Sequence, residues 1–286
     1  MRLLVTGVSG QLGYDVVREL DQRGHDVIGV DRSKMDITDR ENVRDVIRSA
    51  GAECVIHCAA YTAVDAAEDH REDCYNVNVN GTEYIVDVCR ELDLSMVYIS
   101  TDYVFDGKGD RPWEPDDKRE PINYYGQTKY QGERLVTERL DKYFIIRTAW
   151  VFGLNGKNFV RTMLKLGRER KQITVVDDQT GSPTYTYDLA RLIADLAVTH
   201  KYGVYHATNE GYCTWYQFAL EIFKQAEIKV EVLPVTSDVF PSKAKRPANS
   251  RLSKDKLEEK GFLRLPPWQD ALGRYLQSLK EADPAD

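Results

Sequence analysis

The segment "NYYGQTKYQGE" (residues 123–133) holds the side chains of this chain that are best suited to proton transfer. Tyr125 stands four positions before Lys129, so in a helix the two side chains share one face. An ammonium beside a phenol favours the phenolate and lowers the phenol pKa from about 10 toward neutrality. A phenol tuned in this way can give its proton to the alkoxide that forms when a ketone is reduced. Tyr124 and Tyr130 point elsewhere and are interpreted as packing or surface residues.

A hydroxyl that could assist this chemistry lies upstream in "YISTDYVFDG". Thr101 ends an expected strand, where its hydroxyl could hydrogen-bond a substrate carbonyl, whereas Ser100 points to the opposite face. The alternative is that Thr101 only caps a turn. A Tyr-x3-Lys spacing is common in helices, so its meaning depends on position. Here Tyr125 starts the helix after this strand, near the carboxyl ends of the strands, where parallel sheets bind ligands.

Three glycines in "VTGVSGQLG" lie between an expected strand and an expected helix. Gly7 allows a tight turn, Gly10 lets the backbone approach a pyrophosphate, and Gly13 lets the helix pack on the strand. Gln11 and Leu12 begin the helix, whose free amides can bind an anion. The pattern predicts a dinucleotide site, and its alternative is a glycine-rich turn without a ligand.

Residues at the next two strand ends strengthen the dinucleotide hypothesis. Asp31 lies eighteen residues after Gly13 and could accept hydrogen bonds from an adenosine ribose. Arg32 follows at once and could instead meet a 2′-phosphate. Since the acid favours NADH and the base favours NADPH, we expect both dinucleotides to be accepted. Asp36 and Ile37 could cap the adenine ring.

The third expected strand ends in "CAAYT", which offers small residues beside which a cofactor can lie. Ala59, Ala60 and Tyr61 are therefore included among the expected cofactor-binding residues. Small residues are also common wherever packing is tight, so this segment alone would not be decisive. Together with the glycine spacing it supports a dinucleotide cofactor.

Strands and helices alternate over the first 150 residues and must position these side chains. The expected strands cover residues 2–7, 26–31, 54–60, 96–101 and 143–153. The expected helices cover residues 11–24, 39–51, 78–93 and 124–140, and Asp39 caps the second of them. This alternation requires right-handed crossovers. The predicted fold class is α/β, a doubly wound parallel Rossmann sheet with a smaller C-terminal substrate-binding lobe.

The loss of this regularity after Trp150 suggests the domain limits. The dinucleotide-binding domain is expected to cover residues 1–150, with 172–200 as a further part of it. The substrate-binding lobe is expected to cover residues 151–171 and 201–286.

The composition narrows the classes of protein to which this chain can belong. Its 286 residues carry a formal net charge of −7, which disfavours a nucleic-acid partner because phosphate binding needs a basic face. No apolar stretch approaches membrane-spanning length, and no signal peptide is visible. The five cysteines, an odd number, indicate reduced thiols in a reducing compartment. We expect a soluble cytoplasmic protein, either a monomer or a homodimer, without a membrane partner.

Cysteine and histidine are the other residues that could hold a metal or move protons. Cys54 and Cys58 have metal-like spacing, but two strand positions four apart lie about 13 Å from each other, too far for one zinc ion. His57 falls inside the same strand, and His206 lies in "YHATN" with no partner evident. We interpret all four as core or supporting residues.

These motifs also carry a family resemblance. The glycine triplet, "NVNGT" with Asn78, and the set of Thr101, Tyr125 and Lys129 resemble the extended short-chain dehydrogenase/reductase family. The resemblance covers essentially the whole chain. More specific strings resemble the dTDP-4-dehydrorhamnose reductase branch of that family, namely "STDYVFDG", "RTAWVFG", "DDQTGSPT", "GYCTWYQFA" and "KRPANSRL".

The resemblance implies that nicotinamide hydride, from NADPH or NADH, reduces the C4 ketone of dTDP-4-dehydro-L-rhamnose. It further implies that Tyr125 is the proton donor and that Thr101 polarises the carbonyl. Lys129 would hold the nicotinamide ribose and tune Tyr125. Asp102 and Trp150 match positions that contact the sugar in this family.

Two further implications of the resemblance concern the diphosphate and a metal. Arg246, in the "KRPANSRL" loop, would lie over the nucleotide sugar and contact its diphosphate. Some relatives bind magnesium through glutamates at a dimer contact, and Asp15 and Asp188 fall at two such positions. Aspartate is shorter, and no third acid can be matched, so Mg²⁺ is doubtful here.

Two other functions are compatible with the same fold. Regulatory subunits similar to this family bind dinucleotide and partner an enzyme that makes S-adenosylmethionine, but the intact set of Thr101, Tyr125 and Lys129 argues against that function. Nucleotide-sugar epimerases need the same tyrosine and remain open. Dehydratases of the family carry an acid pair after the strand threonine, whereas here Asp102 is followed by Tyr103.

Overall fold

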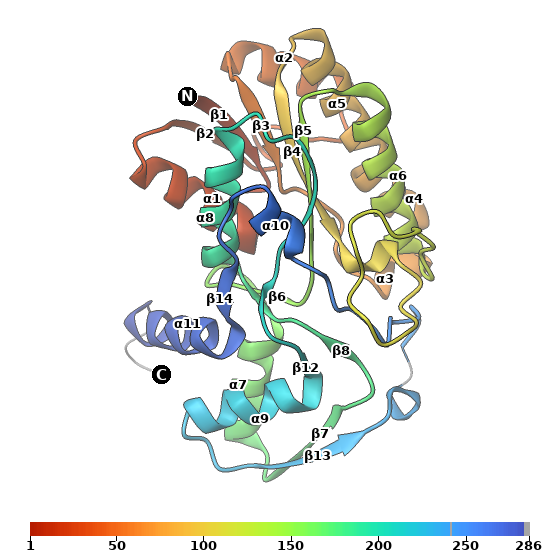
Figure 1. Cartoon of the computed structure of the whole chain (residues 1–286), viewed down its shortest axis with the longest axis vertical. Helices are drawn as coiled ribbons and strands as arrows, with labels where there is room; N and C mark the ends of the chain where they lie inside the picture. The colour runs from red at the N-terminus through yellow and green to blue at the C-terminus, as the bar shows by residue number, and fades with distance from the viewer. Residues whose placement is uncertain (241, 283–286) are drawn as a thin grey trace.

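Parallel strands form the central sheet of this chain (Figure 1). The structure is a computed structural model, and it describes residues 1–240 and 242–282. The strands are β1 (Arg2–Thr6), β2 (Asp26–Val30), β3 (Cys54–His57), β4 (Ser95–Thr101), β5 (Tyr143–Thr148) and β10 (Gly203–His206). Their spatial order is β10-β5-β4-β3-β1-β2, and every neighbouring pair is parallel. The predicted α/β fold class is confirmed.

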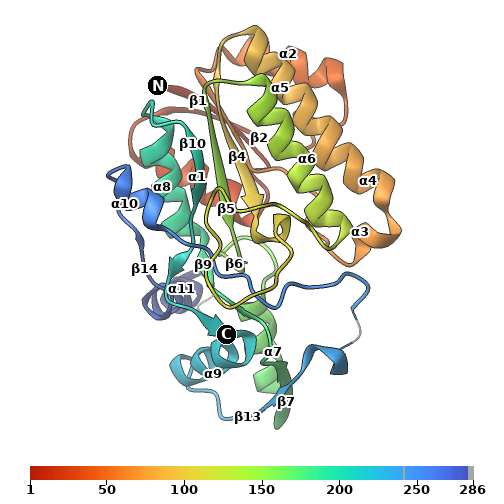
Figure 2. The same ribbon diagram turned by 45° about the vertical axis from the view of Figure 1, so that its right-hand side comes forward.

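Helices cover both faces of this sheet (Figure 2). One face carries α1 (Gln11–Gln22) and α8 (Thr186–Ala197); the other carries α2 (Arg40–Ala50), α5 (Gly81–Glu91) and α6 (Tyr124–Arg139). Alternate residues of β1 divide between the two cores, because Leu3 and Val5 pack with α1 and α8 whereas Leu4 packs with α2 and α5. The predicted cap is present, since the Asp39 carboxylate accepts a hydrogen bond from Asn42 N at 3.1 Å.

The strand order reverses between β1 and β3, because the chain moves outward from β1 to β2 and then returns to place β3 on the other side of β1. The loops after these strands separate at that point and leave a crevice at the carboxyl ends. The glycine loop follows β1, and "CAAYT" follows β3. Both predicted cofactor segments therefore meet at the switch point.

A smaller lobe lies beyond the carboxyl ends of the strands (Figure 1). Its helices are α7 (Phe159–Glu169), α9 (Trp215–Gln225) and α11 (Trp268–Ala282), and its main strand pair is β7 (Gln172–Val176) with β13 (Glu231–Val235). An aromatic core that includes Phe152, Phe218 and Trp268 holds it together. The shorter pairs are β6 (Val151–Phe152) with β9 (Thr184–Tyr185), β8 (Thr180–Gly181) with β12 (Cys213–Thr214), and β11 (Asn209–Glu210) with β14 (Leu265–Pro267).

Short helices complete the connections. They are α3 (Ala66–Asp69), α4 (Arg71–Tyr75), α10 (Asp255–Glu259), a π-helical turn (Asn76–Asn80) and two 3₁₀ turns (Asp102–Val104 and Ser237–Val239). No helix in the described part of the chain is long and apolar enough to cross a membrane.

Two expectations about the strands need correction. Residues 203–206, which were expected in the smaller lobe, pair with β5 and form an edge strand of the main sheet. The strand expected at 143–153 ends at Thr148, because Trp150 takes the left-handed conformation (φ 50°) and breaks the extended chain. The other limits of the two-domain division stay a prediction, and residues 283–286 lie outside the described part.

Candidate functional site

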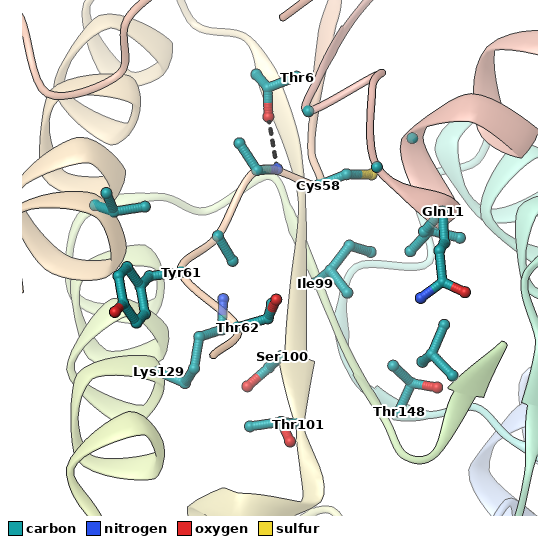
Figure 3. Close-up of a pocket in the computed structure, with 18 of the residues that line it drawn as sticks. Thr6, Gln11, Cys58, Tyr61, Thr62, Ile99, Ser100, Thr101, Lys129 and Thr148 are labelled. Atoms are coloured by element: carbon teal, nitrogen blue, oxygen red, sulfur yellow. Dashed lines mark hydrogen bonds between the residues drawn. The ribbon is translucent and has the colours of Figure 1, made fainter. Parts of the chain in front are cut away.

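One cavity of about 750 Å³ opens at the switch point (Figure 3). All of the sequence-predicted cofactor and catalytic residues line it, from the glycine loop to the start of α6. They are Gly7, Gly10, Gln11, Leu12, Gly13, Asp31, Arg32, Asp36, Ile37, Ala59, Ala60, Tyr61, Thr101, Tyr125 and Lys129. Asp102 and Trp150 also line this cavity, whereas Arg246 lies in a second, adjoining one.

The glycine loop leaves no room for side chains at two of its three glycines. Gly7 has φ 69°, and a Cβ there would lie 2.7 Å from Ala59 N. A Cβ at Gly13 would lie 2.4 Å from Gly7 O. Gly10 is the N-cap of α1 and supplies no capping side chain, so the first amides of the helix are available to an anion. This backbone cradle fits the diphosphate of a dinucleotide.

At the adenosine end of the cavity, hydrogen bonds within the turn after β2 fix the acidic side chains. Asp31 Oδ1 accepts hydrogen bonds from Ser33 Oγ (2.6 Å) and Ser33 N (3.0 Å), which leaves the acceptor capacity of Oδ2 for a ribose hydroxyl. Arg32 Nε donates to Asp36 Oδ2 at 3.2 Å, and the Arg32 side chain is 85% exposed. An exposed guanidinium beside the ribose position is suited to a 2′-phosphate.

The chemical end lies where β4 meets α6. Thr101 is the last residue of β4, and the side chain of Asn123 caps α6 by accepting a hydrogen bond from Gly126 N at 2.8 Å. This cap starts the helix so that Tyr125 and Lys129 share the face toward β4. Thr101, Tyr125 and Lys129 are all at least nine-tenths buried and line the cavity together. Ser100 lines it as well, which the expected alternation of faces did not anticipate.

Lys129 is seated by a residue that the sequence did not single out. Its Nζ lies 4.0 Å from the centre of the Tyr98 ring, a cation–π contact inside the protein. The Tyr98 hydroxyl donates to the Lys129 carbonyl oxygen at 3.3 Å and so fixes the same turn of α6. Tyr98 is fully buried on β4. A tyrosine inside an expected strand gives no sequence signal for this role.

The expectation that Lys129 lowers the pKa of Tyr125 is wrong for this structure. Burial raises the pKa of Tyr125, and the nearby Asp102 charge raises it further, although a hydrogen bond with Thr101 opposes the change. Burial also lowers the pKa of Lys129 to about 7, with partial compensation from the charge of Glu133. The cause is desolvation, since the ammonium lies against Tyr98 and burial removes water from both groups.

Asp102 brings a carboxyl group to the same end of the cavity. Its Oδ1 accepts a hydrogen bond from Thr101 Oγ1 at 3.0 Å, whereas its buried Oδ2 has no partner within the described residues. Burial raises the pKa of Asp102 to about 6, although the hydroxyls of Ser250 and Thr101 oppose the rise. Asp102 lines the cavity, and a carboxyl group with spare acceptor capacity is suited to accept a hydroxyl of a bound sugar.

Asn78 joins the loop after β3 to the catalytic helix. It lies in the π-helical turn, and its Oδ1 accepts a hydrogen bond from Tyr61 N at 2.8 Å. Its Nδ2 donates to Thr128 Oγ1 at 3.0 Å, one residue before Lys129. The sequence pointed to Asn78 through "NVNGT", and the structure shows that the side chain is a buried bridge.

The second cavity, of about 610 Å³, shares Tyr103, Trp150 and Trp215 with the first. The rings of Trp150 and Trp215 stack with centroids 3.7 Å apart, so a flat wall lies between the two cavities. Trp215 belongs to "GYCTWYQFA" but received no role from the sequence. Further lining residues are Asp65, Phe159, Met163, Gln179, Phe240 and Ser250.

Arg246 lines this second cavity but is already paired. Its guanidinium donates to Asp65 Oδ2 at 2.7 Å and to Oδ1 at 3.3 Å, and Lys243 forms a second ion pair with Asp69. These contacts tie Lys243 and Arg246 to the two ends of α3. The expected diphosphate contact therefore requires Arg246 to share or exchange its carboxylate partner.

The acids considered for a metal are also engaged. Asp15 accepts a hydrogen bond from the Thr186 hydroxyl. Asp188 pairs with the Arg274 guanidinium at 2.8 and 2.7 Å and accepts from Asn209 Nδ2 at 2.7 Å. Across residues 1–240 and 242–282, no group of three or more His, Cys, Asp or Glu side chains could hold a metal ion.

His57, His206 and Cys54 are buried core residues, as interpreted from the sequence, whereas Cys58 is partly buried and lines the cofactor cavity. His57 is buried between the hydroxyls of Thr6 (2.9 Å) and Thr82 (3.3 Å). His206 is buried with its Nε2 at 3.3 Å from Arg147 Nη1. Burial lowers the pKa of both imidazoles, that of His57 to about 3, so both are neutral at physiological pH. All five cysteines are free thiols.

Comparison with known proteins gives consistent results. Residues 1–281 match the family described as RmlD substrate binding domain. The chain is 41% identical over 281 residues to the spore coat polysaccharide biosynthesis protein SpsK of Bacillus subtilis, covering 98% of this chain and 99% of that one. It is 39% identical over 284 residues to the dTDP-4-dehydrorhamnose reductase of Aggregatibacter actinomycetemcomitans, covering 95% of this chain and 97% of that one.

A solved structure supports the same relationship. The crystal structure of dTDP-4-dehydrorhamnose reductase from Bacillus anthracis in complex with NADP superposes with a TM-score of 0.94 at 42% identity, covering 97% of this chain and 99% of that one. The proteins from Aggregatibacter actinomycetemcomitans and Bacillus anthracis are both named as reductases.

Proposed function

This chain belongs to the RmlD substrate binding domain family, and we propose that it is an NADPH- or NADH-dependent oxidoreductase that reduces the C4 ketone of dTDP-4-dehydro-L-rhamnose to dTDP-L-rhamnose. The observation that carries the proposal is the meeting of Thr101, Tyr125 and Lys129 in the cavity that also contains the glycine loop. The named activity of the relatives supports the choice of sugar nucleotide.

The cavity residues fit the cofactor along its whole length. Asp31 and Arg32 would hold the adenosine ribose, the cradle of Gly7 and Gly10 would hold the diphosphate, and Lys129 would hold the nicotinamide ribose. When bound, the reduced nicotinamide supplies a hydride to the carbonyl carbon. The burial of the chemical end excludes water from that carbon.

Tyr125 supplies the proton. Its raised pKa keeps the phenol protonated at neutral pH, so it gives up the proton only to a strong base such as the oxygen of a ketone that is being reduced. The Thr101 hydroxyl lies at the same strand end and donates to Asp102 Oδ1 in this structure; it would turn from that carboxylate to donate its hydrogen bond to the ketone oxygen. Lys129, four residues from Tyr125, lines the same cavity and would hold the nicotinamide ribose beside the phenol.

The second cavity is proposed to bind the rest of the substrate. The stacked Trp150 and Trp215 give an aromatic wall for the sugar or base. Asp102, which lines the first cavity, would accept a sugar hydroxyl, and Arg246 would meet the diphosphate after releasing Asp65. This division places the ketone between the two cavities, beside Thr101 and Tyr125.

A direct assay tests the proposed function. Enzymatically generated dTDP-4-dehydro-L-rhamnose is mixed with the protein and either NADPH or NADH, and nicotinamide absorbance is followed together with the sugar product. We expect one dinucleotide to be oxidised for each dTDP-L-rhamnose formed. Dinucleotide binding without consumption would refute the proposal and favour the regulatory-subunit function. Conversion of the sugar without net oxidation would favour an epimerase.

The setting of the enzyme is also proposed. The five free thiols and the need for reduced dinucleotide support a cytoplasmic location. The net charge of −7 supports a small-molecule substrate without a nucleic-acid partner. A monomer and a homodimer both remain compatible with this function.

A further inference from the structure

A short segment of the smaller lobe closes over the glycine loop. This segment, residues 153–158, is called the strap below. The Gln11 side chain accepts hydrogen bonds from Gly153 N (2.9 Å) and Asn158 Nδ2 (3.1 Å). Asn155 Nδ2 donates to Ser9 O at 2.8 Å. The strap therefore joins the two lobes at the position where the dinucleotide diphosphate is expected.

The strap has a defined shape because both of its ends are fixed. Asn158 caps α7 by accepting a hydrogen bond from Arg161 N at 3.0 Å, and its Nδ2 also donates to Gly153 O at 2.9 Å. Gly156 takes φ 102°, a conformation that side chains rarely adopt. Lys157 follows this glycine directly and lines the cofactor cavity at its exposed rim.

The charged residues of the cavity divide along its length. Arg32, Asp31 and Asp36 lie at the adenosine end, and Lys129 and Asp102 lie at the chemical end. Lys157 is the remaining charged lining residue, and it comes from the strap that is hydrogen-bonded to the glycine loop. Within the described residues, no hydrogen bond or ion pair engages its side chain. The middle of the cavity thus has one cation, no acid and the uncapped amides of α1.

We infer that Lys157 binds the diphosphate of the dinucleotide from across the lobe interface. The diphosphate is a dianion that lies on the first amides of α1, and an ammonium on its open side adds a charge-assisted hydrogen bond. Lys157 becomes a cofactor-binding residue supplied by the smaller lobe, so cofactor binding also stabilises the arrangement of the two lobes. This inference rests on the dinucleotide part of the proposed function and does not depend on the sugar.

Equilibrium binding of four ligands to the whole protein tests the assignment. Kd is measured by isothermal titration calorimetry for NADH, NADPH and ADP-ribose, which carry the diphosphate, and for adenosine, which lacks it. Lys157→Gln should weaken all three diphosphate ligands by about five- to tenfold and leave adenosine unchanged. Lys157→Arg should restore most of the affinity. The matched control is Lys171→Gln, which alters an exposed lysine of the same lobe that lines neither cavity.

Two outcomes would overturn the inference. Unchanged NADH and ADP-ribose affinity in Lys157→Gln would show that the lysine does not reach the diphosphate. A loss confined to NADPH would assign Lys157 to the 2′-phosphate instead. A second variant, Asn155→Leu, removes the tie to Ser9 and should weaken the same three ligands, because the strap no longer holds Lys157 in place. Failure of sugar reduction would leave these binding results unaffected, so the two proposals fail separately.

Discussion

At the adenosine end of the cavity, Asp31 and Asp36 are partly exposed to solvent and are held by hydroxyls and amides of their own turns. Hydrogen bonds from Ser33 and Thr38 lower the pKa of Asp31 and of Asp36, respectively. At the chemical end, Tyr125, Lys129 and Asp102 are buried, and desolvation shifts each pKa toward the neutral form. The adenosine end keeps its charges permanently, whereas the chemical end holds groups that can exchange protons.

The difference follows from where each end lies in the fold. The adenosine end is a solvent-exposed turn after an edge strand, so its charges stay hydrated. The chemical end lies between β4, α6 and the smaller lobe, where charge is costly. Ligand recognition needs side chains whose charge stays constant. Proton transfer needs a donor that is protonated at the working pH. The predictions below test this contrast, beginning with the largest expected effect.

Removing the proton donor should give the largest loss. Tyr125→Phe deletes the phenol without changing the ring, and kcat should fall by about 10²- to 10⁴-fold while the Kd for NADPH changes by less than about twofold. The matched control is Tyr124→Phe, whose ring packs near the Arg71 guanidinium at 4.9 Å on the outer side of the helix. Similar losses in both variants would show that Tyr125 is not the donor.

The rate should depend on pH at the chemical end. Asp102 loses its charge as the pH falls through about 6, and Lys129 loses its charge as the pH rises through about 7. If both charged forms are needed, kcat/KM should peak between these values and fall about tenfold per pH unit on either side. Asp102→Asn should remove the acidic limb and keep the basic one. A profile that is flat from pH 5 to about 8 would contradict this assignment.

Changing the adenosine end should alter cofactor choice with little effect on chemistry. Arg32→Gln removes an exposed guanidinium, so the Kd for NADPH should rise about five- to tenfold while the Kd for NADH and the kcat at saturation stay nearly constant. Lys34→Gln, a neighbouring exposed cation, serves as the control. Equal weakening of both dinucleotides would place Arg32 away from the 2′-phosphate.

The smallest effect should be the pH dependence of binding at the adenosine end. ADP-ribose lacks the nicotinamide and meets Asp31 but does not need Lys129. Because the pKa of Asp31 is already below its ordinary value, the Kd for ADP-ribose should vary by less than about twofold between pH 5 and 8. Titration of ADP-ribose at several pH values measures this. A tenfold change would mean that the two ends are electrostatically coupled.

The sequence was sufficient for features that depend on neighbouring residues. Gly7 and Gly13 were predicted from their spacing, and the structure shows backbone atoms where their side chains would lie. Asp39 was predicted as a cap and caps α2. The pair of Tyr125 and Lys129 was predicted from helical spacing and lines one cavity. Helix periodicity, caps and tight turns are short-range constraints, so residue order alone determines them.

Other features were decided only by tertiary structure. The edge position of β10, the seat of Lys129 on Tyr98 and the pairing of Arg246 with Asp65 join residues that are distant in sequence. The expected fall in the Tyr125 pKa was wrong for the same reason, because spacing reports proximity to a charge but not the loss of water. Desolvation depends on everything that packs around a group, and that information exists only once the chain has folded.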